Sequence, residues 1–309
     1  IMELLEPHHL YHASIVVAMT LNACEAPQAP PGNFDTQTSF VKGGEEENQA
    51  GDEERELIYQ STLDGDWVLY SQVSTCVDIG SSLEQYNRSL YLIHVTQSVH
   101  GGLTEVWEAC EIDLTPVISV RAQVPEALRQ SVYPLETRRG QVVGTPPEQR
   151  YTSGALLELW GVVMDEPLID AMPTTPADER LFDMDEDGEA GVTLQIGDAC
   201  MAYMAQRRIT HYHGQMIAPD RIEGEALSVT EQYIIDASAP ICKTSYQIRS
   251  NPARSHFSRV RVDGRGGAIN LDINGDEKVD CTEVQAARNQ LFVETLILTE
   301  LDHDACIIE

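Results

Sequence analysis

The fold class is decided by WVLYSQVS (67–74), SLYLIHV (89–95) and LTEVWEACEI (103–112), three short stretches near the start of the chain's apolar part. They are rich in β-branched and aromatic residues and have Gly, Pro or Asp nearby, which is typical of β-strands. Only residues 125–132 favour a short helix before position 245. Similar strand-like stretches follow at 117–120, 156–162, 192–196, 200–206 and 226–235. The sequence therefore predicts a mainly β protein, an antiparallel β-barrel or sandwich.

The residues just before the first strand bear on the choice between barrel and sandwich. Gly65-Asp66-Trp67 resembles the Gly-x-Trp start of lipocalin-like barrels. That resemblance implies a barrel with an internal ligand cavity, and a lipocalin-like small-molecule carrier is one alternative function. An aromatic residue at a strand start, packed in any β core, explains Trp67 equally well.

The composition limits the partners. The chain has 309 residues, with 50 acidic against 20 basic residues and a net charge of −30. Such a surface repels nucleic acid and anionic lipid headgroups, so neither is expected as a direct partner. No stretch approaches the roughly 20 apolar residues of a membrane span.

The N-terminal part predicts export. An apolar run at 13–23 has the length of a signal-peptide core and ends at Cys24. LNAC at 21–24 resembles a bacterial lipobox, which implies a signal peptide over 1–24, a lipid on Cys24 and an outer-membrane lipoprotein on the periplasmic or cell-surface side. Residues 25–56 are rich in Pro, Gly and acidic groups, so we expect a disordered acidic linker. The alternative is a buried apolar segment with a structural cysteine.

Residues 272–283, DINGDEKVDCTE, place oxygen atoms at the positions that an EF-hand calcium loop requires. Glu277 departs from the pattern, because position 6 turns with positive φ and favours glycine; the strain of about 1–3 kcal/mol would weaken calcium binding. The stretch resembles an EF-hand and, more closely, a dockerin-type loop. The alternative is a solvated acidic turn. The predicted ligands are the side chains at positions 1, 3, 5, 9 and 12 and the carbonyl at 7: Asp272, Asn274, Asp276, Asp280, Glu283 and Lys278.

The flanks of this loop predict half an EF-hand. Residues 282 to about 301 have apolar residues at near-helical spacing and contain no Gly or Pro. The preceding residues supply no entering helix, and 257–262 alternate like an edge strand. We expect a β domain over 57–255 and a calcium loop with a C-terminal helix over 256–309. A loop with one helix suits a structural clamp better than a sensor, which needs two helices to open.

Another acidic loop, which begins at Asp183, lies inside the β region. It has carboxylates at positions 1, 3 and 5 and Gly188 at position 6, but position 12 is Leu194, so it is not a full EF-hand. It resembles the Asp-x-Asp-x-Asp-Gly calcium loops found between strands of extracellular proteins. An exposed acidic hairpin is the alternative. The predicted ligands are three carboxylates and one carbonyl: Asp183, Asp185, Asp187 and Glu189.

His211 and His213 are a possible metal pair. On a strand they would share one face, so both imidazoles could meet one zinc or iron ion. A metal-dependent enzyme that uses them is therefore a second alternative, against solvent-facing strand residues. No nucleophile elbow, phosphate-binding loop or His-Glu-x-x-His motif is present, so no catalytic residue is predicted.

The chain has seven cysteines. With Cys24 lipidated, six remain, an even number suited to an oxidising compartment. Fifteen connectivities are possible. Proximity in sequence favours the pairs Cys76–Cys110, Cys200–Cys242 and Cys281–Cys306.

Several short stretches together are similar to uncharacterised secreted and lipid-anchored proteins of myxobacteria-like bacteria. The resemblance implies export and calcium loops, and it implies no activity. We therefore expect an exported, lipid-anchored, calcium-binding β protein that acts as a non-catalytic binding or surface module. The stretches are PTT (173–175), LFDMDEDG (181–188), GVT (191–193), RIEG (221–224), DING (272–275) and CTEV (281–284).

Overall fold

A computed structural model describes most of the chain from residue 63 onward. The backbone contacts divide the chain into Ile1–Glu56 and Leu57–Glu309, and every described residue belongs to the second unit. The predicted signal peptide, lipidation at Cys24 and acidic linker lie outside the described residues, as does the predicted helix at 125–132. The described residues are 63–78, 81–114, 120–122, 136–145, 148–196, 200–243, 247–292 and 303–306.

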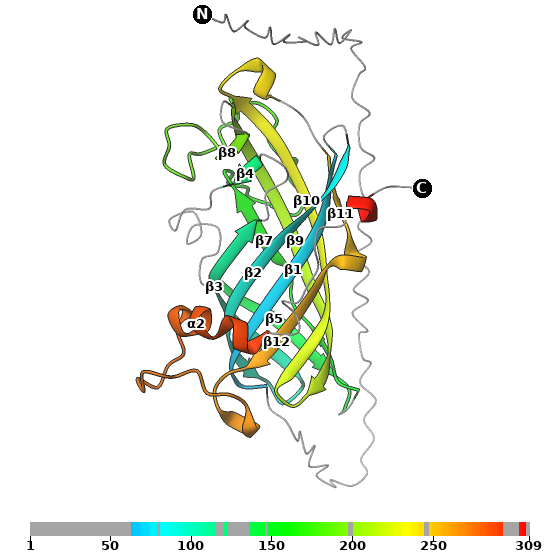
Figure 1. Cartoon of the computed structure of the whole chain (residues 1–309), viewed down its shortest axis with the longest axis vertical. Coiled ribbons are helices and arrows are strands. Elements are labelled where there is room, and N and C mark those ends of the chain that lie inside the picture. Colours follow the sequence, from blue (N-terminus) through cyan, green and yellow to red (C-terminus); the bar gives the residue numbers. More distant parts are fainter. Residues whose placement is uncertain are drawn as a thin grey trace, which may run out of the picture. The chain divides into compact units, whose positions relative to one another are not determined.

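The protein is mainly β, as predicted, and its strands form one sheet in which each strand pair is antiparallel (Figure 1). Within the described ranges, the helical elements are α2 (Cys281–Leu291), η1 (Pro240–Cys242), η2 (Pro252–Arg254), η3 (Arg265–Gly267) and η4 (His303–Cys306). The strands are β1 (Gly65–Asp78), β2 (Ser82–Gln97), β3 (Gly102–Leu114), β4 (Val120–Ala122), β5 (Glu136–Val143), β6 (Arg150–Thr152), β7 (Leu156–Trp160), β8 (Val192–Ile196), β9 (Cys200–Ala218), β10 (Arg221–Ala237), β11 (Gln247–Ser250) and β12 (His256–Arg261).

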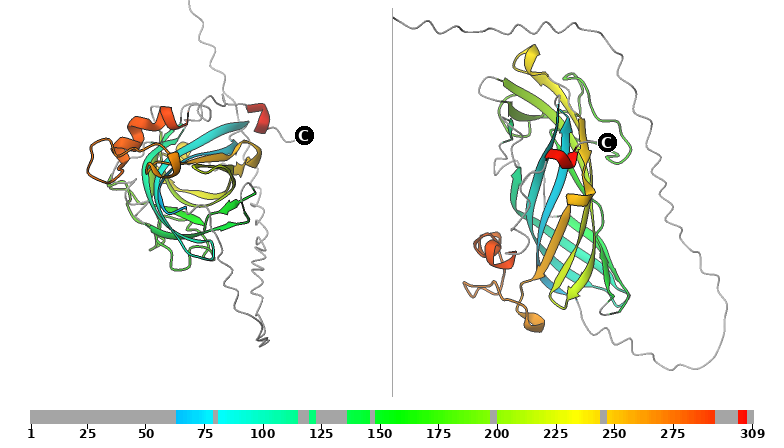
Figure 2. Two further views of the ribbon diagram at one scale, coloured as in Figure 1. Left: turned by 90° about the horizontal axis from the view of Figure 1, so that it is seen from below. Right: turned by 45° about the vertical axis from the view of Figure 1, so that its right-hand side comes forward.

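The sheet curls round and meets itself at one end. Neighbouring strands run β10–β12–β1–β2–β3–β5–β6–β9, and β9 pairs again with β10. The short strand β6 makes this connection, opposite residues 213–215 of β9. Towards the other end, β9 pairs with β7 and β8 instead, and the described part of β3 beyond Trp107 pairs with β2 alone. The sheet is therefore barrel-like at one end and not a closed barrel along its whole length (Figure 2).

Aromatic side chains fill the inside of the curled sheet. Tyr91, Trp107, Tyr212 and Phe257 come from four different strands, and each is at most 3% exposed. Successive rings contact one another, with centroids 5.3 Å apart for Tyr91–Trp107, 5.7 Å for Trp107–Tyr212 and 5.2 Å for Tyr212–Phe257. Such pairs add to the free energy of burial by roughly 0.5–1.5 kcal/mol each.

Two opposed glycines make room for these rings. Gly214 on β9 faces Gly224 on β10. A Cβ atom on Gly224 would lie 2.0 Å from the carbonyl oxygen of His213, and one on Gly214 would lie 2.7 Å from the Phe257 ring. The ring therefore packs against bare backbone, which only glycine permits.

A buried ion pair crosses the same interior. Arg259 Nη1 lies 2.6 Å from Glu105 Oε1, and neither side chain is exposed. Glu105 also accepts hydrogen bonds from the Trp107 indole at 3.2 Å and the Tyr151 hydroxyl at 3.1 Å. The Arg259 guanidinium lies over the rings of Tyr151 and Trp67. These contacts offset part of the cost of desolvation, because Nε and Nη2 of Arg259 are buried without a hydrogen-bond partner. Removal of one partner would cost about 3–5 kcal/mol.

A second core lies on the outside of the sheet, where α2 packs against β2 and β3 and residues beside the helix reach β1 and β12. Val284 and Phe292 are fully buried there, and the Phe292 ring lies 5.5 Å from that of Tyr70 on β1. Val279, at position 8 of the predicted calcium loop before α2, is also buried in this cluster. Figure 1 shows α2 and its preceding loop beside the lower end of the strands.

One prediction about the strands is wrong. Residues 257–262 are not an edge strand, because β12 pairs with β1 on one side and β10 on the other. The boundary predicted between 255 and 256 therefore cuts through the sheet. The error has a physical reason: a basic, glycine-flanked strand looks exposed in sequence, but Arg259 is buried against Glu105. The predicted strand at 200–206 is confirmed, and β9 extends beyond it to include His211 and His213.

The disulfide prediction is confirmed for one pair and wrong for two. Cys200–Cys242 is present as predicted. The predicted pairs Cys76–Cys110 and Cys281–Cys306 are replaced by Cys76–Cys306 and Cys110–Cys281.

Strand register explains why Cys76 cannot reach Cys110. Across β2, Cys76 lies opposite Glu84, whereas Cys110 lies beside the irregularity at Leu90 and Tyr91. Six residues of extended strand between these points correspond to about 20 Å, too far for a disulfide. The bonded Cα atoms are 5.5 Å apart in Cys76–Cys306 and 4.9 Å apart in Cys110–Cys281.

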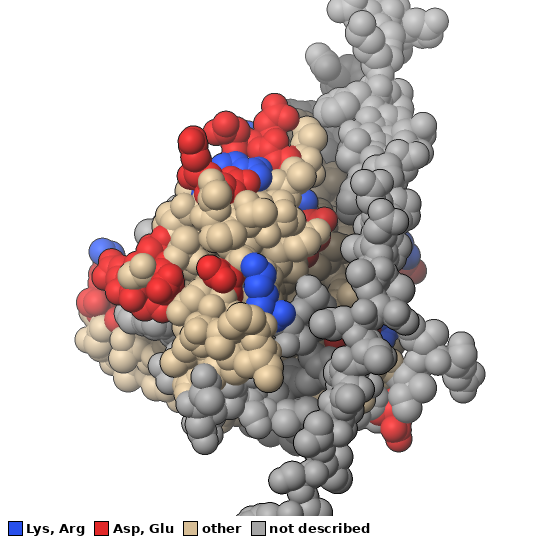
Figure 3. Space-filling model, turned by 90° about the horizontal axis from the view of Figure 1, so that it is seen from above, with Lys and Arg blue, Asp and Glu red and all other residues tan. Residues whose placement is uncertain are grey.

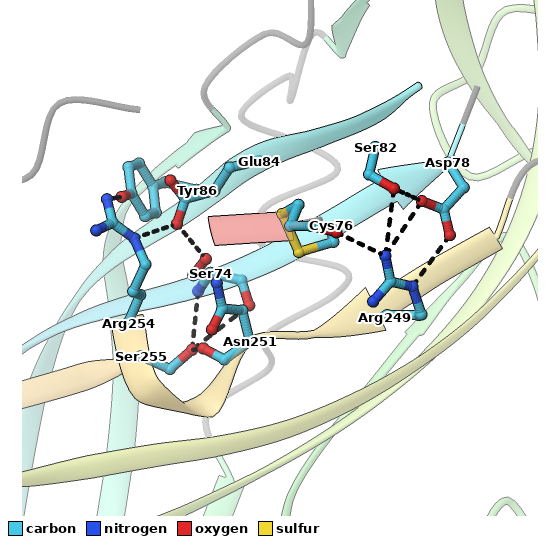
Figure 4. The surroundings of a disulfide bond; sticks show 11 residues. Ser74, Cys76, Asp78, Ser82, Glu84, Tyr86, Arg249, Asn251, Arg254 and Ser255 are labelled. Atoms are coloured by element: carbon cyan, nitrogen blue, oxygen red, sulfur yellow. Dashed lines mark hydrogen bonds and ion pairs between the residues drawn. A yellow bond between two sulfur atoms is a disulfide. The ribbon is translucent and has the colours of Figure 1, made fainter. Parts of the chain in front are cut away.

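Polar contacts reinforce the Cys76–Cys306 disulfide (Figure 4). Arg249 on β11 donates from Nε to Asp78 Oδ2 at 3.0 Å and from Nη2 to the carbonyl oxygen of Cys306 at 3.2 Å. The disulfide and Arg249 together hold η4 against β1.

Within the described part of the chain, no helix has the length and apolar character of a membrane span.

Candidate metal sites

The first acidic loop along the chain contains Asp183, Asp185 and Asp187. It lies in the connection from β7 to β8 and is fixed at its base. Met184 is buried, and its sulfur accepts a hydrogen bond from the Gly161 N–H at 3.0 Å. The Gly191 N–H donates to the Phe182 carbonyl at 2.9 Å, and the Met184 N–H donates to the Gly191 carbonyl at 3.1 Å. The exposed tip is therefore held on a rigid, strand-like base.

The tip brings three carboxylates together. One ligand oxygen from each of Asp183, Asp185 and Asp187 lies within 4.8 Å of the others. Asp183 accepts the N–H groups of Asp187 at 3.1 Å and Gly188 at 2.8 Å, and Gly188 has a φ of 96°. Asp185 Oδ2 accepts the Thr193 N–H at 2.8 Å. Backbone donors thus aim all three carboxylates at one another.

Asp185 is the member of this group that most needs a cation. Its Oδ1 atom is buried and has no hydrogen-bond partner. Burial, followed by the charges of Asp187 and Asp183, raises the pKa of its carboxyl. A desolvated oxygen between two like charges is unfavourable, and a bound cation would compensate both effects.

Other features of this loop bear on the predicted ligands. Leu194 at position 12 is buried, which agrees with the prediction that this is not a full EF-hand. The Glu189 N–H donates to Asp187 Oδ1 at 3.0 Å, and ligation through the Glu189 carbonyl stays a prediction. The sequence did not indicate Thr193, whose hydroxyl also donates to Asp187. No spacing rule marks Thr193, because only the closed loop brings it to the carboxylates.

The second acidic loop, residues 272–283, leads into the capped helix α2. Asp280 caps α2 by accepting the N–H groups of Thr282 and Glu283. Glu283 is buried and accepts the Ile273 N–H at 2.8 Å, the Asn274 N–H at 3.2 Å and, in return, the Asp280 N–H at 3.2 Å. The carboxylate at position 12 therefore lies against the start of the loop.

The remaining predicted ligands bond to their own loop. Asp272 Oδ2 accepts the Glu277 N–H at 3.0 Å, Asn274 Oδ1 the Asp276 N–H at 2.8 Å, and Asp276 Oδ1 the Lys278 N–H at 3.0 Å. Glu277 has a φ of 66°, which confirms the positive φ expected at position 6.

The two loops differ in convergence. Among the described residues, the Asp183 group is the one place where three metal-ligating side chains come within 4.8 Å of one another. The carboxylates of 272–283 form no such group. Of the described elements before that loop, the nearest are β12 and the 3₁₀ turn η3, so the entering side has no α-helix, as predicted. The loop is a strand-to-helix connection.

His211 and His213 lie on the outer face of β9, on either side of the inward-facing Tyr212. Their ring centroids are 6.3 Å apart. Burial, followed by the neighbouring His213, lowers the pKa of the His211 imidazole. The described residues provide no third His, Cys, Asp or Glu ligand within 4.8 Å of this pair, so metal binding there stays a prediction.

No protein-family model, curated protein or solved structure matches this chain. The geometry of the two acidic loops and the packing of the sheet are therefore the features that bear on function.

Proposed function

We propose that this protein is an exported, non-catalytic binding or surface module that uses calcium to stabilise its β domain. The observation that carries the proposal is the convergence of Asp183, Asp185 and Asp187 around the buried, unpartnered oxygen of Asp185. The loop at 272–283 is proposed as a second, weaker calcium site that fixes α2 to the sheet.

Calcium suits these donors better than a softer ion. It prefers oxygen ligands, particularly carboxylates and backbone carbonyls, and tolerates irregular geometry. The net charge of −30 adds a general attraction for cations. Viewed from above, the surface carries several groups of Asp and Glu side chains with few Lys or Arg among them (Figure 3).

The packing of the sheet favours a structural module over the alternative of a lipocalin-like carrier. Aromatic rings and the Arg259–Glu105 pair occupy the closed end of the sheet, where a ligand cavity would lie. The surface exposed by the outer strands and loops is then the part available to a partner.

Export and membrane attachment are proposed from the sequence at Cys24. Three disulfides support an oxidising compartment. Attachment would be through the lipid alone, which leaves the β domain free in the periplasm or at the cell surface.

The test is a thermal melt of the full chain with calcium and after calcium removal. We expect calcium to raise the Tm by several degrees, because a ligand at about 100 times its Kd stabilises the folded state by about 2.7 kcal/mol. Asp185→Asn should remove most of this rise. An identical Tm with and without calcium would rule out the proposal.

A matched variant separates the site from general charge. Asp165 is an exposed acidic residue of the same β7–β8 connection and does not belong to the Asp183 group. Asp165→Asn makes the same change in net charge and should preserve the calcium response. If both variants lose it equally, calcium acts on the acidic surface as a whole and no specific site exists.

A further inference from the structure

A second type of ligand set lies on the outer face of β9 and β10. His211 and His213 project from the same face of β9, and Glu225 on β10 lies directly opposite His213 in the antiparallel register. Directly opposed residues have Cβ atoms about 4.5–5.5 Å apart. Two imidazoles and one carboxylate therefore share a single patch of the outer surface.

We propose that His211, His213 and Glu225 bind a divalent transition ion such as zinc, at a site separate from the calcium loops. Imidazole nitrogen is a preferred ligand of zinc, copper and nickel, whereas calcium takes oxygen. Two histidines and one carboxylate also leave coordination positions open for water or for a group on a partner.

These three side chains are free to take part. Among the described residues, no hydrogen bond or ion pair involves the imidazole of His211, the imidazole of His213 or the carboxylate of Glu225. His94 provides the contrast: it is also on an outer face, but its Nδ1 atom lies 2.5 Å from Asp66 Oδ1. An exposed histidine of this protein can thus be engaged by a neighbour, and the β9 pair is not.

The site forms by side-chain rotation. As placed, the ring centroids are 6.3 Å apart, and the three ligand atoms do not lie within 4.8 Å of one another. His213 and Glu225 are exposed and His211 is half-buried, so each side chain can change rotamer without moving the sheet. The backbone of paired strands keeps the three Cα atoms in place, which limits the entropy lost on binding.

The test is a calorimetric titration of zinc chloride into the full chain at neutral pH in excess calcium, which competes with zinc for the acidic loops. We expect one zinc ion per chain with micromolar affinity. His211→Asn and His213→Asn should each weaken binding at least about tenfold, because even the loss of a group that only orients a metal ligand typically costs 10- to 100-fold. Glu225→Gln should weaken binding less.

Two control variants make the test decisive. His94→Gln removes an exposed histidine outside the patch, and Asp185→Asn removes a carboxylate of the Asp183 group; both should leave zinc affinity unchanged. The proposal is overturned if no heat is seen at millimolar zinc, if the two β9 histidine variants bind as the parent does, or if Asp185→Asn abolishes binding. Unchanged Tm values of the histidine variants without zinc show that they fold. The result is independent of the calcium proposal, since calcium need not bind for the histidines to do so.

Discussion

The two acidic loops have similar sequences, but the fold uses their carboxylates differently. In the loop after β7, three aspartates point at one another, and one buried oxygen has no partner. In the loop before α2, the acidic side chains accept backbone N–H groups of the loop and of the helix start. Glu283, the carboxylate predicted at position 12, already joins the two ends of the loop by accepting the Ile273 and Asp280 N–H groups.

The comparison teaches that ligand spacing alone does not measure the demand for a metal. The better match to the EF-hand pattern is the loop that is already satisfied by its own hydrogen bonds. The poorer match holds the oxygen whose burial is uncompensated. A cation would therefore stabilise the 183–187 loop most, while disulfide and helix-capping contacts already hold 272–283.

The largest expected effect comes from breaking the covalent support of the second loop. Replacement of Cys110 and Cys281 together by alanine should lower the free energy of unfolding by about 3–4 kcal/mol, because the unfolded chain gains freedom. Urea denaturation measures this loss. The calcium response carried by Asp185 should survive, since that loop contains neither cysteine. A loss below about 1 kcal/mol would mean that packing of α2 suffices without the disulfide.

The next largest effect tests the self-closure of the second loop. Glu283→Ala should cost about 2–3 kcal/mol, because it removes hydrogen bonds to three partly buried backbone donors and half of the capping box. Asn289→Ala is the control, as Asn289 is exposed on the same helix. Chemical denaturation of both variants without calcium gives the difference. Equal stabilities would show that Glu283 acts only as a metal ligand.

A smaller, stabilising effect is expected at position 6 of the second loop. Glu277→Gly should raise the free energy of unfolding by about 1 kcal/mol, because glycine adopts the positive φ of 66° without strain. Calcium affinity of that loop should rise with it. Glu186→Gly, at a φ of 60° in the first loop, is the matched change. Destabilisation by Glu277→Gly would show that the Glu277 side chain makes a contact that outweighs its backbone strain.

The smallest effect is a pH dependence at Asp185. Its pKa is raised in the folded state above the ordinary value of 3.8, so the folded protein binds the proton more tightly than the unfolded one. Without calcium, this group therefore costs stability as pH rises from about 3.8 through the raised pKa, and the cost is absent below that window. The difference in Tm between the parent and Asp185→Asn, in calcium-stripped buffer, should grow from pH 4 to pH 7 in favour of the variant. A constant difference would contradict the assignment.

Local signals made part of this structure predictable. The first three predicted strands lie within β1, β2 and β3: Trp67–Ser74, Ser89–Val95 and Leu103–Ile112. They were predictable because closely spaced β-branched and aromatic residues favour a strand whichever strand it pairs with. The positive φ at Glu277 and the helix after Asp280 were likewise predictable, since turn chemistry and capping act over a few residues.

Long-range register was not predictable. The pairing of β12 with β1 and of Cys110 with Cys281 depends on contacts more than 150 residues apart. Sequence proximity favoured the wrong cysteine partners because it ignores the extent of β2 between them. The contacts of Trp107 with Tyr91 and Tyr212 also could not be predicted from the sequence, because the three residues come from different strands.

A mainly β chain with two acidic loops follows from the sequence alone, because strand propensity and loop spacing are local properties. Which carboxylates remain uncompensated depends on the tertiary structure. That outcome depends on the donors the fold brings to each oxygen: Glu283 meets the backbone of its own loop, while Asp185 Oδ1 is buried between charges and meets none.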